Sequence, residues 1–151
     1  RRPDGWESLG DIGRLDAEGY LYLGDRLADM ILRGGANIYP AEVEAAVSEH
    51  PHVRSCVVVG LPDPELGQRV HALLELNDGA DAQEIADGMG AFLGERLSRY
   101  KHPESFEAVA TSPRDDSGKV RRTLLRDERA EWLKQGRAFR IVPARASVGA
   151  D

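Results

Sequence analysis

One lysine of this chain stands in a setting suited to binding a phosphate. Lys119 follows the polar segment 112–118 and precedes an expected helix that begins near Arg121. An ammonium group carried by a short mobile loop can reach a phosphate oxygen and offset its negative charge. The alternative is a solvated surface lysine, which is the usual environment of this residue type. The rest of the chain has to decide between a phosphate site and an ordinary surface loop.

The composition is that of a soluble globular protein, and it argues against several classes of partner. Of the 151 residues, 41% are hydrophobic and 30% are charged, and the formal net charge is −6. An acidic chain without a dense basic stripe is not expected to bind nucleic acid. No apolar run approaches the roughly 20 residues that a membrane span needs. The single cysteine, Cys56, excludes a disulfide framework, so we expect a reducing, cytoplasmic location. Because the chain begins at Arg1 without a methionine, we expect a piece of a longer polypeptide.

The spacing of apolar residues predicts a small α+β layer. A turn containing Asp16 and Gly19 interrupts segment 11–24, which predicts a β-hairpin. Pro40 stands at the expected first position of a helix that ends before Pro51. The other expected elements are strands over 53–60, 69–76 and 105–110 and helices over 81–97 and 121–135.

The lengths of the connections predict how the strands pair. The connector 61–68 is too short for a crossover helix, so the two strands that it joins should be antiparallel. We expect an antiparallel sheet of about three strands with helices packed on it, preceded by the hairpin. His50, His52 and His71 have no cysteine or carboxylate at ligand spacing, so we interpret them as incidental and expect no metal site.

Five motifs in series resemble the adenylate-forming superfamily, which includes acyl-CoA synthetases, peptide-synthetase adenylation domains and firefly luciferase. The motifs are GDIG at 10–13, DAEGYLY at 16–22, DRLADMI at 25–31, GGANIYPAEVE at 34–44 and PRDDSGKVRR at 113–122. The resemblance extends over roughly residues 5–133 and is greatest to the fatty-acyl and aryl-acyl CoA synthetases. Any one of these motifs alone would be weak, but their order and spacing also agree.

The resemblance implies a function in two half-reactions. A carboxylate attacks the α-phosphate of ATP, with Mg²⁺ expected to accompany the nucleotide, and CoA then displaces AMP from the acyl-adenylate. The chain would supply the small C-terminal domain, residues 29–135, which rotates about a hinge. Residues 1–28 would be the end of the large N-terminal AMP-binding domain with the hinge, and residues 136–151 a flexible tail. The partners would be the missing N-terminal domain and a small carboxylic acid, and the isolated chain is expected to be inactive.

The resemblance also assigns roles in the first half-reaction. Lys119 corresponds to the adenylation lysine, and in this setting it also resembles lysines whose acylation inactivates such ligases. Asp11 corresponds to an aspartate that accepts hydrogen bonds from both ribose hydroxyls of ATP, and Arg26 to an arginine that contacts the nucleotide. Ala28 and Asp29 lie at the hinge. The alternatives are a turn-capping role for Asp11 and an ion pair of Arg26 with a nearby aspartate.

A second group of residues resembles the CoA channel of the family: Gly34, Gly35, Asn37, Tyr100, Lys101 and His102. Glycines would leave room for the pantetheine arm, where a Cβ would obstruct it. The aromatic ring would stack on adenine, and the lysine would meet a phosphate. The alternative for the glycines is a plain turn before the helix at Pro40.

The chain departs from the family pattern at several positions. Leu9 stands where many members have threonine, and Ala28 stands at a hinge position that is commonly Asp or Lys. Leu66, before Gly67, replaces a tryptophan that stacks in certain members, and His102 replaces a common arginine. Two other functions stay open at this point: an adenylation domain that loads a carrier protein, and a non-catalytic α+β module that binds a small ligand.

Overall fold

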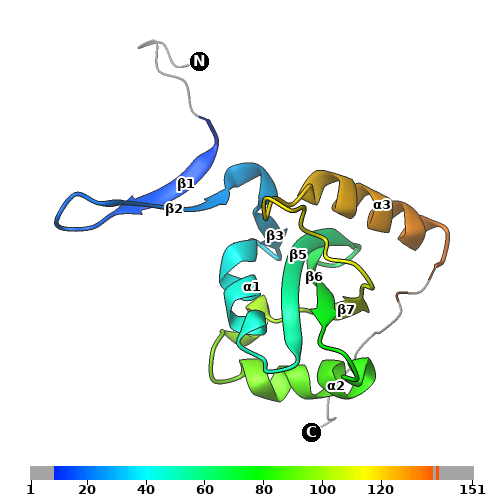
Figure 1. Ribbon diagram of the computed structural model, residues 1–151. Helices are drawn as coiled ribbons and strands as arrows, with labels where there is room; N and C mark the ends of the chain where they lie inside the picture. Colours follow the sequence, from blue (N-terminus) through cyan, green and yellow to red (C-terminus); the bar gives the residue numbers. More distant parts are fainter. Residues whose placement is uncertain (1–8, 138, 140–151) are drawn as a thin grey trace, which may run out of the picture.

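The computed structural model describes residues 9–137 and 139 (Figure 1). The strands are β1 (Asp11–Leu15), β2 (Leu21–Arg26), β3 (Ile31–Arg33), β4 (Ala36–Ile38), β5 (Val53–Asp63), β6 (Gly67–Leu76) and β7 (Ser105–Ala108). The helices are α1 (Pro40–Ser48), α2 (Ala82–Leu93) and α3 (Arg122–Lys134), with short 3₁₀ turns η1 (Leu27–Asp29) and η2 (Arg99–Lys101). The predicted α+β class is confirmed, as are all of the predicted helices and strands. The β3–β4 hairpin is an addition, since three-residue strands are too short to leave a periodic pattern.

The main sheet has three strands in the order β5-β6-β7. The predicted antiparallel pairing of β5 and β6 is confirmed, with Val58 opposite Ala72. The prediction of an antiparallel sheet throughout is wrong for the last strand, because β7 runs parallel to β6. The connection 77–104 contains α2 and carries the chain back across the sheet, and a crossover of that length permits parallel pairing.

Both faces of the main sheet are covered, because apolar side chains of β5 alternate between two clusters. Cys56 and Val58 lie in the larger cluster with α1 and α2. Val57 and Val59 lie in the smaller cluster, against which residues of α3 pack. Figure 1 shows α3 apart from α1 and α2, with the sheet between them. This arrangement explains why the run 56–59 is apolar without interruption.

Helices α1 and α2 begin where their sequences predict. Pro40 occupies the first turn of α1, and the Asp81 carboxylate accepts hydrogen bonds from the N–H groups of Gln83 and Glu84 at the start of α2. Helix α2 ends at Leu93, four residues before the predicted end, with Gly94 as its C-cap.

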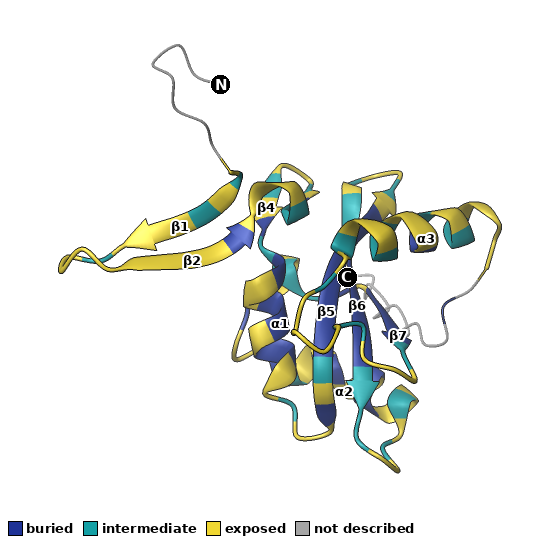
Figure 2. Ribbon diagram, turned by 45° about the horizontal axis from the view of Figure 1, so that its top comes forward, coloured by how far each residue is buried: buried dark blue, intermediate teal, exposed yellow. Residues whose placement is uncertain are grey.

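The β1–β2 hairpin projects away from the rest of the molecule (Figure 1). Most of its residues are exposed (Figure 2), including the apolar side chains of Leu15, Leu21 and Leu23. A two-stranded hairpin with exposed leucines gains little stability by itself. Its surface is therefore suited to contact with another domain.

The predicted flexible tail, 136–151, lies mostly outside the described residues. Within it, Phe139 is buried and joins the smaller cluster with Val57 and Leu73. No helix in the described part of the chain is long and apolar enough to cross a membrane.

Candidate functional site

Lys119 lies in a closed loop between β7 and α3, and its side chain is exposed. The Asp115 carboxylate accepts hydrogen bonds from the Ser117 N–H (3.0 Å), the Ser117 hydroxyl (2.6 Å) and the Lys119 N–H (2.9 Å). The Asp115 N–H in turn donates to the Lys119 carbonyl at 2.9 Å, and Gly118 turns the chain with φ +76°. These hydrogen bonds, led by the one from Ser117, hold the pKa of Asp115 below its usual value. The backbone of Lys119 is thus fixed while its ammonium group faces solvent.

Both ends of the lysine loop, residues 114–122, are bound to one buried carboxylate. Arg114 Nη2 donates to Glu44 Oε2 at 3.1 Å and to the Cys56 carbonyl at 3.1 Å. Arg122 Nη2 donates to the other oxygen, Glu44 Oε1. That oxygen also accepts the N–H of Val58 in β5 at 2.8 Å. The carboxylate therefore connects α1, the main sheet and the loop.

A hollow of about 400 Å³ adjoins the loop. Lys119, Arg114 and Arg121 line it together with the Asp115 side chain and apolar Leu124. Arg114 is paired with Glu44, but Lys119 and Arg121 form no ion pair among the described residues, and with one acidic side chain beside them the hollow is suitable for an anion.

The two residues predicted to bind the nucleotide lie side by side. Asp11 and Arg26 are register partners at the open end of the β1–β2 hairpin. Arg26 Nε lies 3.7 Å from Asp11 Oδ1, and both side chains are largely exposed. The alternative partners of Arg26, Asp25 and Asp29, do not pair with it within the described residues. A loose exposed ion pair contributes little stability, so both groups can turn to a ligand at small cost.

The predicted hinge residues Ala28 and Asp29 lie in η1, a single 3₁₀ turn between β2 and β3. A hydrogen bond connects the hairpin side of this turn to the main body. The buried carboxylate of Asp25 accepts the Ala41 N–H in the first turn of α1 at 2.9 Å. A rotation about Ala28 would stretch or break this bond.

The predicted glycine turn connects β3 to β4. Gly34 and Gly35 have φ of +54° and +84°, values that glycine adopts without strain. The Gly34 N–H donates to the Leu66 carbonyl at 2.8 Å, and the Leu32 N–H donates to Gln68 Oε1 at 2.7 Å. A Cβ on Gly35 would meet no atom within 4 Å, so this side of the turn is open. The turn thus rests on the segment 66–68, which contains Leu66 at the position of the family's stacking tryptophan.

The remaining residues predicted for the channel lie in and after η2. Lys101 Nζ donates to both carboxylate oxygens of Glu42 at 2.7 and 2.8 Å, and this bonding raises the pKa of the lysine. Tyr100 is exposed, with Lys101 Nζ 5.7 Å from its ring centroid. His102 Nε2 lies 3.0 Å from the Leu97 carbonyl. Because the Lys101 ammonium group is paired with Glu42, it is not free to bind a phosphate in this conformation.

The η2 segment and the glycine turn are bound to each other. Arg33, before the turn, forms two hydrogen bonds to the Glu104 carboxylate at 2.6 and 3.0 Å. Asn37 is exposed on β4, opposite Leu32. Among the described residues, the contacts that hold the glycine turn share no residue with those that hold the lysine loop.

A buried polar cluster lies under α3, and no motif or spacing in the sequence indicates it. His71 is fully buried, and its Nδ1 lies 2.8 Å from the Ser105 hydroxyl. Its Nε2 lies 3.5 Å from Glu107, which also pairs with Arg129 of α3 at 2.9 and 3.0 Å. His71 has a structural role that its position in a strand does not indicate, since it joins β6 to the network that holds α3. A single strand histidine gives no signal of partners that come from β7 and α3.

The protonation of this cluster follows from burial and from its hydrogen bonds. Burial lowers the pKa of His71, against an opposing effect of Glu107. Burial would raise the pKa of Glu107, but the bonds from His71 and Arg129 outweigh it and lower that pKa to about 2. A neutral imidazole with its proton on Nε2 then donates to Glu107 and accepts from Ser105. No group of three or more histidine, cysteine or carboxylate side chains suited to a metal ion occurs within the described residues.

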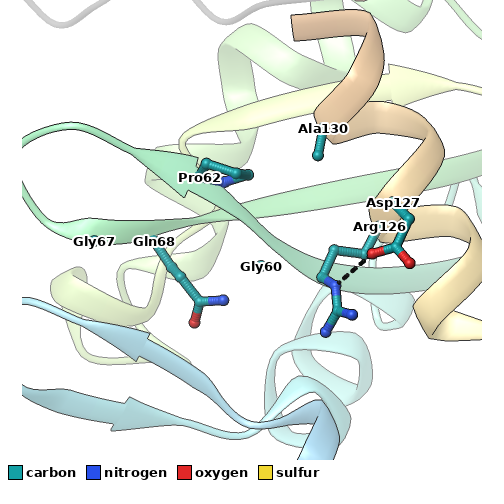
Figure 3. Close-up of a pocket in the computed structure, with 7 residues that line it drawn as sticks. All are labelled: Gly60, Pro62, Gly67, Gln68, Arg126, Asp127 and Ala130. Atoms are coloured by element: carbon teal, nitrogen blue, oxygen red, sulfur yellow. Dashed lines mark hydrogen bonds and ion pairs between the residues drawn. The ribbon is translucent and has the colours of Figure 1, made fainter. Parts of the chain in front are cut away.

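A second, smaller groove of about 250 Å³ lies between the β5–β6 hairpin and α3 (Figure 3). Arg126 and Asp127 pair with each other at 3.1 Å on its helical side, and Gln68 lies on the strand side. The one arginine of this groove is paired with Asp127, whereas Lys119 and Arg121 of the other hollow form no ion pair among the described residues, so this groove offers less to an anion.

Comparison with known proteins agrees with this geometry. Residues 42–119 match the family described as the AMP-binding enzyme C-terminal domain. The chain is 45% identical over 126 residues to 2-succinylbenzoate–CoA ligase of Bacillus velezensis, covering 83% of this chain and 25% of that protein. It is 41% identical over 126 residues to the long-chain-fatty-acid–CoA ligase FadD13 of Mycobacterium tuberculosis, covering 83% and 24%. The chain therefore spans about a quarter of the length of the curated relatives that it matches.

Solved structures give the same result. The o-succinylbenzoate CoA synthetase of Bacillus subtilis, in complex with the acyl-adenylate OSB-AMP, superposes with a TM-score of 0.70 at 41% identity, covering 83% of this chain and 25% of that one. ATP-bound MatB from Rhodopseudomonas palustris superposes with a TM-score of 0.76 at 30% identity, covering 86% and 25%. Sequence family and fold thus agree, and this chain belongs to the AMP-binding enzyme C-terminal domain family.

Proposed function

We propose that this chain is the mobile C-terminal domain of an acyl-CoA ligase that activates a carboxylic acid with ATP and transfers it to CoA. The observation that carries the proposal is Lys119, whose backbone is held by Asp115 while its ammonium group is exposed beside a basic hollow. The relatives support the reaction class, since their names are those of CoA ligases. Mg²⁺ would enter bound to ATP.

In the first half-reaction, Lys119 would act by charge alone. A carboxylate oxygen of the acid attacks the α-phosphorus of ATP, and the bond to pyrophosphate breaks. Negative charge collects between the carboxylate and the α-phosphate, and an ammonium group placed there stabilises it without a proton transfer. Asp11 would accept hydrogen bonds from the ribose hydroxyls, and Arg26 would bind nucleotide oxygens once their 3.7 Å pair opens.

In the second half-reaction, the glycine turn would face the arm of CoA. The thiol sulfur attacks the acyl carbon, AMP leaves, and the open side of Gly35 leaves room for the chain that carries the thiol. Lys101 could meet a CoA phosphate only with Glu42 beside it, or after leaving that carboxylate. We therefore assign adenine stacking to Tyr100 and a minor role to Lys101.

A large AMP-binding domain is the proposed partner. The relatives are about four times as long as the matched segment, and the hairpin carries exposed leucines that such a domain would cover. Rotation at Ala28 and Asp29 would present the lysine loop in one half-reaction and the glycine turn in the other. The isolated chain would be inactive because it holds only part of the site.

A domain replacement tests this proposal. The corresponding C-terminal region of the Bacillus subtilis 2-succinylbenzoate–CoA ligase, which is 43% identical over 126 residues, would be exchanged for this chain. ATP–pyrophosphate exchange with 2-succinylbenzoate should be absent from the truncated host and present in the chimera. Lys119→Ala should lower exchange about 100-fold or more, the usual effect of removing one charge-stabilising group.

The matched control is Lys134→Ala, which removes an exposed lysine of α3 that pairs only with Glu131 among the described residues. This control should keep full exchange activity. Exchange that survives Lys119→Ala would refute the role of the lysine. A folded chimera that binds AMP but catalyses no exchange would refute the function proposed for the domain.

A further inference from the structure

We propose that Glu44 is the positioning residue of the lysine loop and sets where Lys119 stands relative to the sheet. The catalytic part of this inference depends on the function proposed above, whereas the structural part can be measured on the chain alone. Nothing in the spacing of the sequence connects the two, since Glu44 lies on α1, 75 residues before Lys119.

The first argument is the number of elements that meet at this carboxylate. Glu44 Oε1 accepts the N–H of Val58 and a guanidinium N–H of Arg122, and Oε2 accepts from Arg114. Val58 is fully buried in the sheet, so the carboxylate is fixed to the most rigid part of the molecule. The two arginines stand at opposite ends of the loop, and one carboxylate therefore holds both ends.

The second argument is that the connection reaches the residue beside the lysine. Arg114 Nη1 donates to the Gly118 carbonyl at 3.3 Å while its Nη2 binds Glu44. Asp115 binds the N–H of Lys119 at 2.9 Å. Internal hydrogen bonds thus close the loop on itself, and Arg114 connects the loop to Glu44.

The third argument is burial. Glu44 is 7% exposed, and a buried carboxylate is stable only when it is paired and hydrogen-bonded. Loop residues 115–119 are exposed and belong to neither apolar cluster, and within the loop Val120 alone packs against the smaller cluster, so core packing holds the loop only weakly. Losing the carboxylate should release the loop while the sheet and its two clusters keep their packing.

A nitroxide at position 116 measures this release directly. Asp116 is exposed, so Asp116→Cys gives one accessible thiol; Cys56 is 2% exposed, and burial raises the pKa of its thiol, so it stays unlabelled. We expect an immobilised spectrum for the otherwise unchanged chain. Glu44→Gln should make the nitroxide several-fold more mobile.

Glu107→Gln is the matched control, because Glu107 is 8% exposed and also pairs with an arginine of α3. This variant should lower the melting temperature and leave the nitroxide immobile. If Glu44→Gln prevents folding, Arg114→Gln removes one end of the connection from a half-exposed position and should give the same mobility. An immobile label in a folded Glu44→Gln or Arg114→Gln chain would overturn the inference.

The two half-reactions separate positioning from general stability. In the chimera described above, Glu44→Gln should lower ATP–pyrophosphate exchange 10-fold or more. It should leave thioester formation from preformed acyl-adenylate within about 2-fold. Equal loss in both half-reactions would make Glu44 a stability residue and overturn the positioning role. An inactive unsubstituted chimera would instead refute the proposed function, and the nitroxide would still decide whether Glu44 holds the loop.

Discussion

The buried imidazole of His71 should make the stability of this domain depend on pH between 7.5 and 5.5. Burial lowers the pKa of His71 in the folded chain. At pH values below the ordinary histidine pKa of about 6.5, the folded state therefore binds fewer protons than the unfolded state. Stability contributed by a depressed pKa of this kind is present at higher pH and is lost as pH falls. Glu107, Arg129 and Arg69 are the charged groups that act on the ring.

The size of the effect follows from proton linkage. If the folded state stays unprotonated at pH 5.5, the unfolded state gains about 1.4 kcal/mol from one histidine that titrates near 6.5. For a domain of this length, this loss corresponds to a fall of roughly 3–8 °C in melting temperature. Glu107, whose pKa is lowered to about 2, adds a separate loss only as pH falls below about 4.5.

The assay is urea unfolding at pH 7.5 and 5.5 of the unchanged chain and of His71→Gln. Glutamine can accept from the Ser105 hydroxyl and donate to Glu107, but it does not titrate. The difference in unfolding free energy between the two chains should shrink at the lower pH, by about 1.4 kcal/mol if the folded state stays unprotonated. His50→Gln, which removes a half-buried imidazole outside the cluster, should change the pH dependence less. A difference that does not vary with pH would show that the folded state accepts the proton and would refute the reasoning.

Three further substitutions test the packing and turns that support the site. Asp25→Ala removes the acceptor of the Ala41 N–H and should cost about 1 kcal/mol of stability, measured by urea unfolding, whereas Asp25→Asn should cost less. Gly35→Ala should cost about 1–2 kcal/mol through its φ of +84° without any clash, so its crystal structure should show an unmoved turn. Met89→Ala empties a fully buried position and should cost about 2–5 kcal/mol by the same unfolding assay; a smaller loss would contradict the packing of α2.

Much of the fold was predictable because its signals are local. The apolar run at 56–59, the proline at the start of α1 and the Asp81 cap each act through neighbours a few residues away. The direction of β7 was not predictable in this way, because it depends on how the chain returns across the sheet after α2.

In the candidate site, too, residues in local motifs were predictable from the sequence, whereas contacts between distant segments were not. Lys119, Asp11 and Arg26 stand in recognisable motifs, but Asp11 lies opposite Arg26 only because the hairpin register shifts between Asp11 and Gly13, which the turn does not predict. Their functional roles stay predictions. Glu44 belongs to a motif that the sequence analysis quoted, but its contact with Arg114 joins residues 70 positions apart. No periodicity or spacing in the sequence indicates a contact between residues so far apart.

By itself, the sequence determined which side chains capable of binding or catalysis the chain carries. It also determined which local elements hold them, because helix caps, turns and strand alternation depend on short-range interactions. Only the tertiary structure decided which of these side chains are free to act. It engages Lys101 with Glu42, leaves the ammonium group of Lys119 exposed and buries His71 against Glu107. These outcomes depend on burial and on charges brought together from distant segments, since desolvation and ion pairing are properties of the folded chain.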